Sequence, residues 1–93
     1  MEKLLIAAIL LALLAACAPS QLPPDGAEVS WDQAVALLHD GQVSQIFQAH
    51  SLRVVLTLRN GAQVSTMEPS IDAIFFEVER CGAPCANIAL ATE

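Results

Sequence analysis

The chain is 93 residues long and carries ten acidic against four basic side chains, a net charge of −6 at pH 7. Such an acidic chain is a poor candidate for binding nucleic acid, because phosphate contacts need clustered lysines and arginines. The length leaves room for one small domain, and domains of this size bury only about 60% of their unfolded surface.

An apolar run near the start of the chain has the length of a signal-peptide core. It extends from Leu4 to Ala16 and is shorter than the about 20 apolar residues that a transmembrane helix needs. Lys3 precedes it as a thin positive region, and small residues end it, as at cleavage sites. We therefore expect residues 1–16 to be a cleaved signal peptide.

The run ends in Leu14-Ala15-Ala16-Cys17, which resembles the lipobox of bacterial lipoprotein precursors. The resemblance implies that Cys17 is joined by a thioether to diacylglycerol and that signal peptidase II cuts before it. The new amine is then acylated, usually with a fatty acid such as palmitate. Each buried methylene contributes about 0.8 kcal/mol, so two or three chains anchor stably. The alternative is an ordinary secretory signal with a chance cysteine.

The mature chain is therefore expected to be exported and held at a membrane by the lipid on Cys17. Ala18 stands where an aspartate is associated with inner-membrane retention, so the resemblance favours the outer membrane, facing the periplasm, if the host has two membranes. In a host with one membrane, the outer face of the cell membrane is expected. Residues 17–27 form the lipidated N-terminus and a stiff, proline-rich linker, and residues 28–93 form the folded domain.

The first stretch of the domain predicts a helix between Ser30 and Gly41. Ser30 fits the N-cap, Gln33 completes a capping box, and Gly41 supplies the C-terminal stop. The helix is expected to bury an apolar face made of Trp31, Ala34, Val35 and Leu38. Residues 43–50 follow with the alternation of a strand, although each face carries an apolar residue.

Asn60-Gly61 predicts a hairpin over residues 52–69. A two-residue loop would place Leu56 opposite Ser65. A three-residue loop, residues 59–61 with Gly61 left-handed, places Leu56 opposite Val64. The second register packs apolar on apolar, and we predict it.

The last predicted helix follows Pro69, with Ser70 as its expected cap. Its apolar stripe is expected to be Ile71, Ile74, Phe75 and Val78. Phe76 points away from that stripe. The elements predict an α+β fold, a helix, a three- to four-stranded antiparallel sheet and a helix, with both helices on one face. Residues 88–91 are the candidate fourth strand.

Cys81 and Cys85 are expected to form a disulfide at the end of this helix. They are left as a pair once Cys17 carries lipid, and exported thiols oxidise. Residues four apart at a helix end lie within disulfide range. The alternatives are a redox-active pair and a zinc site completed by His39 and His50, although the redox pattern is normally C-x-x-C next to a βαβ unit.

The stretch from Ser30 to about Pro69 resembles the small extracytoplasmic domain of FtsH-type membrane AAA+ proteases. The matching features are the first helix, "GQVSQI" and the hairpin "VVLTLRNGAQVSTMEP". The chain has no Walker A loop and no H-E-x-x-H motif, so protease and ATPase activity do not carry over. The resemblance implies a non-catalytic module that mediates assembly or partner contacts beside a membrane.

No residue set predicts an enzyme, a cofactor or a metal. The serines Ser44 and Ser51 lack nucleophile-elbow glycines, so a triad with His39 or His50 is not expected. Phe76 has two interpretations. Either the tail folds back and covers it with Ile88 and Leu90, or it is an exposed anchor for a partner.

The sequence therefore predicts a membrane-anchored, non-enzymatic adaptor for an envelope or membrane protein. The alternatives are a thiol-disulfide redox protein and a structural envelope lipoprotein without a discrete partner.

Overall fold

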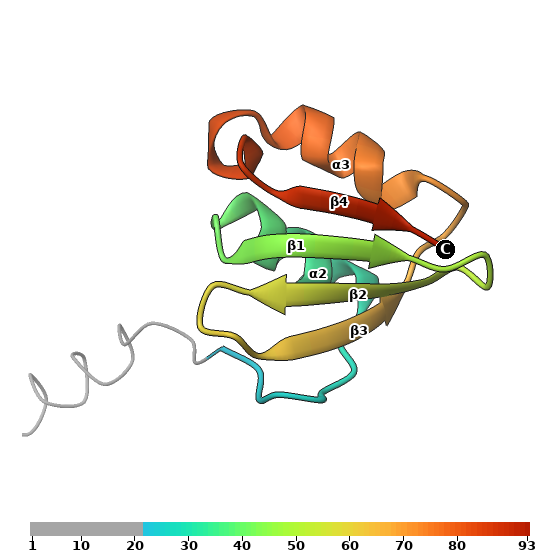
Figure 1. Cartoon of the computed structure of the whole chain (residues 1–93), viewed down its shortest axis with the longest axis horizontal. Coiled ribbons are helices and arrows are strands. Elements are labelled where there is room, and N and C mark those ends of the chain that lie inside the picture. Colours follow the sequence, from blue (N-terminus) through green and yellow to red (C-terminus); the bar gives the residue numbers. More distant parts are fainter. Residues whose placement is uncertain (1–21) are drawn as a thin grey trace, which may run out of the picture.

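The computed structural model describes residues 22–93, so the expected signal peptide and Cys17 lie outside the described residues. In chain order the elements are α2 (Trp31–His39), β1 (Val43–Gln48), β2 (Arg53–Leu58), β3 (Gln63–Met67), α3 (Ala73–Cys81), the 3-10 helix η1 (Ala83–Cys85) and β4 (Ala89–Thr92). The strands form one sheet in the order β3-β2-β1-β4 (Figure 1).

The predicted α+β class is confirmed, and the sheet is mixed. β1 pairs antiparallel with β2, and β2 with β3, as expected. The fourth strand, β4, pairs with β1 and runs parallel to it, whereas an antiparallel sheet was predicted. A parallel partner requires a crossover, and here α3 and η1 provide it.

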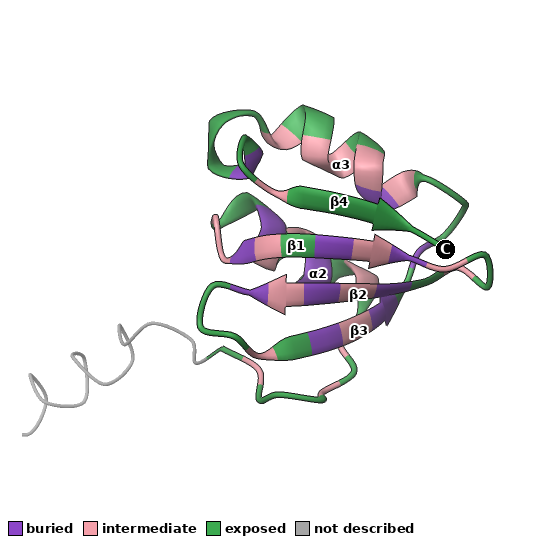
Figure 2. Ribbon diagram, viewed as in Figure 1, coloured by how far each residue is buried: buried purple, intermediate pink, exposed green. Residues whose placement is uncertain are grey.

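The core lies between the two helices and one face of the sheet (Figure 2). Leu38 of α2 and Ile74 of α3 are fully buried against the inward-facing strand residues. Those residues are Val43, Ile46, Val54, Leu56, Leu58 and Val64. Within residues 22–93, no helix combines the length and the apolar character that a membrane crossing requires.

The first helix begins and ends as predicted. Ser30 N donates to Gln33 Oε1 at 2.9 Å, and Gln33 N donates to Ser30 Oγ at 3.1 Å, which completes the capping box. Gly41 follows the helix with φ 72°, a left-handed conformation that glycine adopts without steric cost. Ala34 and Leu38 are buried, and Trp31 packs against the core at its edge.

A bulge explains why β1 carries apolar residues on both alternations. Val43 pairs with Leu58, but Gln45 already pairs with Thr57, so Ser44 is the extra residue. One inserted residue moves the following side chains to the other face. Val43 and Ile46 therefore both point into the core.

The β2–β3 hairpin has the predicted three-residue loop. Leu56 pairs with Val64, and Leu58 N donates to Ala62 O at 2.8 Å. Gly61 has φ 91°. The choice of the register that pairs two apolar side chains therefore predicted the loop length correctly.

The start of α3 differs from the prediction. The helix begins at Ala73, so Ser70 is not its cap, and Ile71 lies before the helix and is 47% exposed. Glu68 supplies the missing cap, since its Oε1 accepts a hydrogen bond from Ala73 N at 3.0 Å. This cap comes from the end of β3, outside the local pattern that Ser70 offered.

Candidate functional site

The predicted disulfide joins Cys81 and Cys85, with Cα atoms 5.8 Å apart. Gly82 lies between them in a left-handed conformation, φ 71°, and ends α3. The two sulfur atoms lie 3.7 and 3.3 Å from the carbonyl oxygen of Leu38, near the end of α2. The bridge therefore fixes η1 against α2 and directs the following chain into β4.

The surroundings of the disulfide disfavour redox catalysis. Cys85 is only 3% exposed and belongs to the core cluster. A catalytic cysteine needs access to its substrate and a stabilised thiolate, and burial among apolar side chains opposes both. These surroundings are typical of a disulfide that stabilises the fold.

The candidate zinc ligands do not converge. His39 ends α2 just before β1, whereas His50 follows the far end of β1. His39 Nε2 lies 3.4 Å from Glu77 Oε2, and the backbone N–H of His50 donates to Glu93 Oε2 at 3.2 Å. Within residues 22–93, no group of three or more His, Cys, Asp or Glu side chains could hold a metal ion.

The candidate serines are not hydrogen-bonded to the candidate histidines among residues 22–93, although Ser51 directly follows His50 in the chain. Ser44 Oγ donates to the backbone oxygen of Thr57 at 3.1 Å. In the hydrogen-bond network of residues 22–93, neither Ser44 nor Ser51 is paired with His39 or His50. The described part of the chain therefore forms no Ser-His pair.

Phe76 is exposed on α3. Its exposed fraction is 57%, and that of Leu90 is 51%. The prediction that Ile88 and Leu90 fold over Phe76 is wrong, because the tail instead pairs with β1 as β4, with Leu90 opposite Ile46. The alternative prediction, an exposed aromatic side chain, is the one that the structure confirms.

The outer edge of β4 is the free edge of the sheet. Glu93 N donates to Gln48 O at 2.9 Å, so the backbone groups of Glu93 and Ala91 face β1. Backbone groups alternate along a strand, so the N–H and C=O groups of Leu90 and Thr92 face outward. β4 ends the strand order, and no described strand pairs with this side.

The opposite edge of the sheet is covered. The segment before α2 lies along β3, where Gly26 N donates to Gln63 O at 2.7 Å and Ser65 N donates to Ala27 O at 3.0 Å. Asp25 Oδ1 also accepts from Gln63 N at 2.7 Å. Natural sheets protect their edges in this way. The outer edge of β4, by contrast, is not paired with any described strand.

The charged side chains near Phe76 on α3 are those of Glu79 and Arg80. Glu79 lies three residues after Phe76, on the same side of the helix, whereas Asp72 precedes the helix and its carboxylate accepts a hydrogen bond from Gln48 of β1. Arg80 also lies on the Phe76 side, but it is paired with Glu77 at 2.7 Å. Phe76 is therefore accompanied by one carboxylate, that of Glu79, which has no ion-pair partner among residues 22–93.

A buried polar cluster at the start of α3 was missed from the sequence. Gln48 Nε2 donates to Asp72 Oδ1 at 3.0 Å, and Asp72 N donates to Gln48 Oε1 at 2.8 Å. Glu68 is 3% exposed, and its Oε2 has no hydrogen-bond partner among residues 22–93, as is true of Thr66 Oγ1. The sequence signal for this cluster was a polar residue at an inward-facing strand position, as at Gln48 and Thr66.

Burial raises the pKa of the Glu68 carboxyl above its ordinary value of 4.5. The hydrogen bond from Ala73 N opposes the rise, and the nearby charge of Asp72 adds to it. The cluster caps α3, so it is explained by the fold without a ligand.

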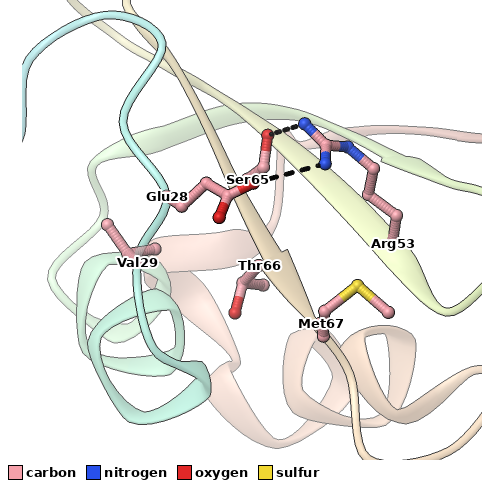
Figure 3. A pocket seen from close by; sticks show the side chains of 6 residues that line it. All are labelled: Glu28, Val29, Arg53, Ser65, Thr66 and Met67. Atoms are coloured by element: carbon pink, nitrogen blue, oxygen red, sulfur yellow. Dashed lines mark hydrogen bonds and ion pairs between the residues drawn. The ribbon is translucent and has the colours of Figure 1, made fainter.

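One hollow of the described surface is small. It has a volume of about 70 Å³ and lies where the segment before α2 meets β3, with Arg53 among its lining residues (Figure 3). The Arg53 guanidinium contacts Ser65 Oγ at 3.0 Å and Glu28 Oε1 at 3.5 Å. This volume is below the about 300 Å³ at which ligand pockets begin.

A wider groove of about 470 Å³ lies between the segment at Leu22 and Pro23 and the outer side of α2. Its lining is mainly apolar, with Asp40 as the only titratable side chain. It brings together no pair of acidic, basic or nucleophilic groups.

No known protein-family model matches the chain, and no curated protein is similar to it. The resemblance to the extracytoplasmic domain of FtsH-type proteases therefore stays a prediction. The candidate lipidation site, Cys17, lies outside the described residues.

Proposed function

We propose that the chain is an exported lipoprotein whose domain binds an envelope or membrane protein and has no catalytic activity of its own. The observation that carries the proposal is the exposed Phe76 of α3, the helix that lies nearer to β4 and its unpaired edge in Figure 1. Exposed aromatic side chains are enriched at binding hot spots.

The membrane anchor in this proposal rests on the sequence. Leu14-Ala15-Ala16-Cys17 closes an apolar run of signal-peptide length. The Cys81–Cys85 disulfide agrees with export, because such bonds persist in oxidising compartments. Lipid on Cys17 would hold the domain beside a membrane partner, with the outer membrane facing the periplasm as the location in a host with two membranes.

The entry point of the chain suits such a tether. The segment from Leu22 joins the domain along β3, and β4 lies at the other end of the strand order (Figure 1). Three strand spacings of about 4.8 Å separate the two edges, so the free edge lies roughly 15 Å from the edge that carries the tether. A partner can therefore reach β4 while the lipid is inserted.

Photo-crosslinking in intact cells tests the proposal. A crosslinking amino acid replaces Phe76 in one strain and the exposed Asp32 of α2 in the control strain. The expected result is one discrete adduct from Phe76 only, lost when Cys17→Ala releases the domain from the membrane. Adducts from neither position would contradict the adaptor function and favour a structural envelope lipoprotein without a discrete partner.

A further inference from the structure

We infer that the free edge of β4 binds an extended, cationic segment of the partner as a fifth strand of the sheet. The inference rests on the proposed adaptor function and names its binding mode. β4 offers two outward N–H groups and two outward C=O groups, those of Leu90 and Thr92. Strand addition uses such groups for affinity and side-chain contacts for specificity.

The side chains beside this edge set the chemistry of the occupant. Leu90 pairs with the buried Ile46, so its side chain lies on the face of the sheet that the helices cover. Phe76 is exposed on α3, the helix nearer to β4 in Figure 1. An added strand that follows the alternation of β4 presents every second side chain to this face. One of these is expected to be apolar and to contact Phe76 and Leu90.

Charge complementarity makes the occupant cationic. Glu79 shares the Phe76 side of α3, and Arg80 on that side is already paired with Glu77. Glu2 and Lys3 cancel, so residues 22–93 retain the net charge of −6. Lysines or arginines beside the apolar residue would meet the Glu79 carboxylate and the negative charge of the domain as a whole. The same charge opposes pairing of β4 with a second copy of the chain, because like charges are brought together.

The inference is tested with three synthetic peptides and the disulfide-bonded full chain. The probe is Thr-Lys-Thr-Val-Thr-Lys-Thr, which places Lys, Val and Lys on one face of a strand. The first control replaces both lysines by glutamates, and the second replaces the threonine after valine by proline, which removes a backbone donor. Amide exchange measured by NMR reports which backbone groups of the protein become bonded.

The lysine peptide is expected to slow the exchange of the Leu90 and Thr92 amides by about five- to tenfold at saturation, the factor that one net hydrogen bond gives. The Ala91 and Glu93 amides already face β1 and should change little. Protection at other amides, or equal protection by the glutamate or the proline peptide, would overturn the inference. So would protection of Leu90 and Thr92 that grows with protein concentration alone, which would identify a second copy as the occupant.

Two matched variants distinguish an effect of the β4 edge on peptide binding from a disturbance of the rest of the fold. Thr92→Pro removes an outward N–H and should abolish peptide binding, whereas Thr92→Val keeps it and should bind as the wild type does. The Ala91 and Glu93 amides verify that β4 stays paired in both. Glu79→Gln should weaken binding by up to about fivefold, as loss of a surface ion pair does, and Asp32→Asn should not.

The two proposals fail in different ways. A Phe76 adduct in cells without strand protection in solution would overturn the binding mode and leave the adaptor function standing. Strand protection without any adduct in cells would contradict the adaptor function.

Discussion

Glu68 is the only charged side chain among residues 22–93 that is buried. Its carboxylate accepts the Ala73 N–H at the start of α3 through Oε1, while Oε2 has no partner among the described residues. A half-satisfied buried carboxylate costs free energy when it is ionised. Protonation removes that charge, which is why burial raises the pKa of Glu68.

Glu68→Gln should remove a pH dependence of stability. A carboxyl whose pKa is raised on folding stabilises the folded state below its unfolded pKa, about 4.5, and this stabilisation is lost as pH rises through the folded pKa. The free energy of unfolding of the wild type relative to Glu68→Gln should therefore fall as pH rises above about 4.5 and then level off. Urea denaturation across this range measures it. Glu79→Gln, an exposed substitution with the same charge change, should show no such fall.

Gly61 shows how one residue fixes a register. Its φ of 91° lies in a region that costs a residue with a side chain about 1–2 kcal/mol, and no atom lies within 4 Å of the place where a Cβ would sit. Gly61→Ala should therefore destabilise the domain by about 1 kcal/mol through backbone conformation alone. Gly61→Asn should cost less, because asparagine tolerates this conformation. Equal stability of all three proteins in thermal unfolding would contradict this account of the loop.

At the scale of elements, β4 is held by the disulfide as well as by its pairing with β1. The bridge lies between α3 and β4, and Cys85 packs into the core. β4 itself is exposed along its whole length, so its side chains contribute little burial. Its hydrogen bonds therefore depend on the chain being directed onto β1 at η1.

Replacing Cys81 and Cys85 by serine should cost about 2 kcal/mol of unfolding free energy, the value that chain entropy gives for so short a loop. The loss should also be local. Exchange of the Ala91 and Glu93 amides should accelerate more than that of β2, because β4 frays first. Urea denaturation and amide exchange measure the two effects. Uniform acceleration across the sheet would show that the bridge supports the whole core and not β4 in particular.

The elements that the sequence predicts well are those with local signals. The α2 capping box involves residues three apart, and the hairpin register follows from Leu56 and Val64 across a short loop. The sequence prediction failed at two places. Glu68, five residues before Ala73, replaced Ser70 as the cap of α3, and the tail gained a parallel partner, β1, that lies about forty residues earlier in the chain.

The candidate site could likewise be predicted from the sequence only where its features have local signals. The disulfide was predictable because both cysteines lie in one short stretch. The exposure of Phe76 was predictable in part, since the helical period places it off the apolar stripe, but whether the tail covered it depended on the β4 pairing. The free edge is a property of the strand order, which no single segment encodes.

At the scale of the whole molecule, the acidic charge and the free edge act together. An exposed strand edge invites pairing between copies, and proteins commonly guard against this with charges near the edge. Here the net charge of −6 repels other copies of the chain, and under the proposed binding mode Glu79 on the Phe76 side of α3 would favour a cationic partner. Among residues 22–93, the outer edge of β4 is therefore left without a strand paired to it.

The same charge bears on the proposed attachment to the membrane through lipid on Cys17. Anionic headgroups repel an acidic domain, so surface charge would not hold it at a bilayer. Two or three acyl chains hold far more firmly than surface charge, and salt does not weaken them. The wild type should therefore stay in the membrane fraction after a high-salt wash and leave it only with detergent.

Cys17→Ala should appear in the soluble fraction at low salt if cleavage still occurs at a nearby site. Because an uncleaved signal peptide would also retain the variant, its N-terminus is determined by mass spectrometry. A cleaved Cys17→Ala protein that still resists the salt wash would show that the domain is held by a protein partner, with the lipid only adding to that attachment.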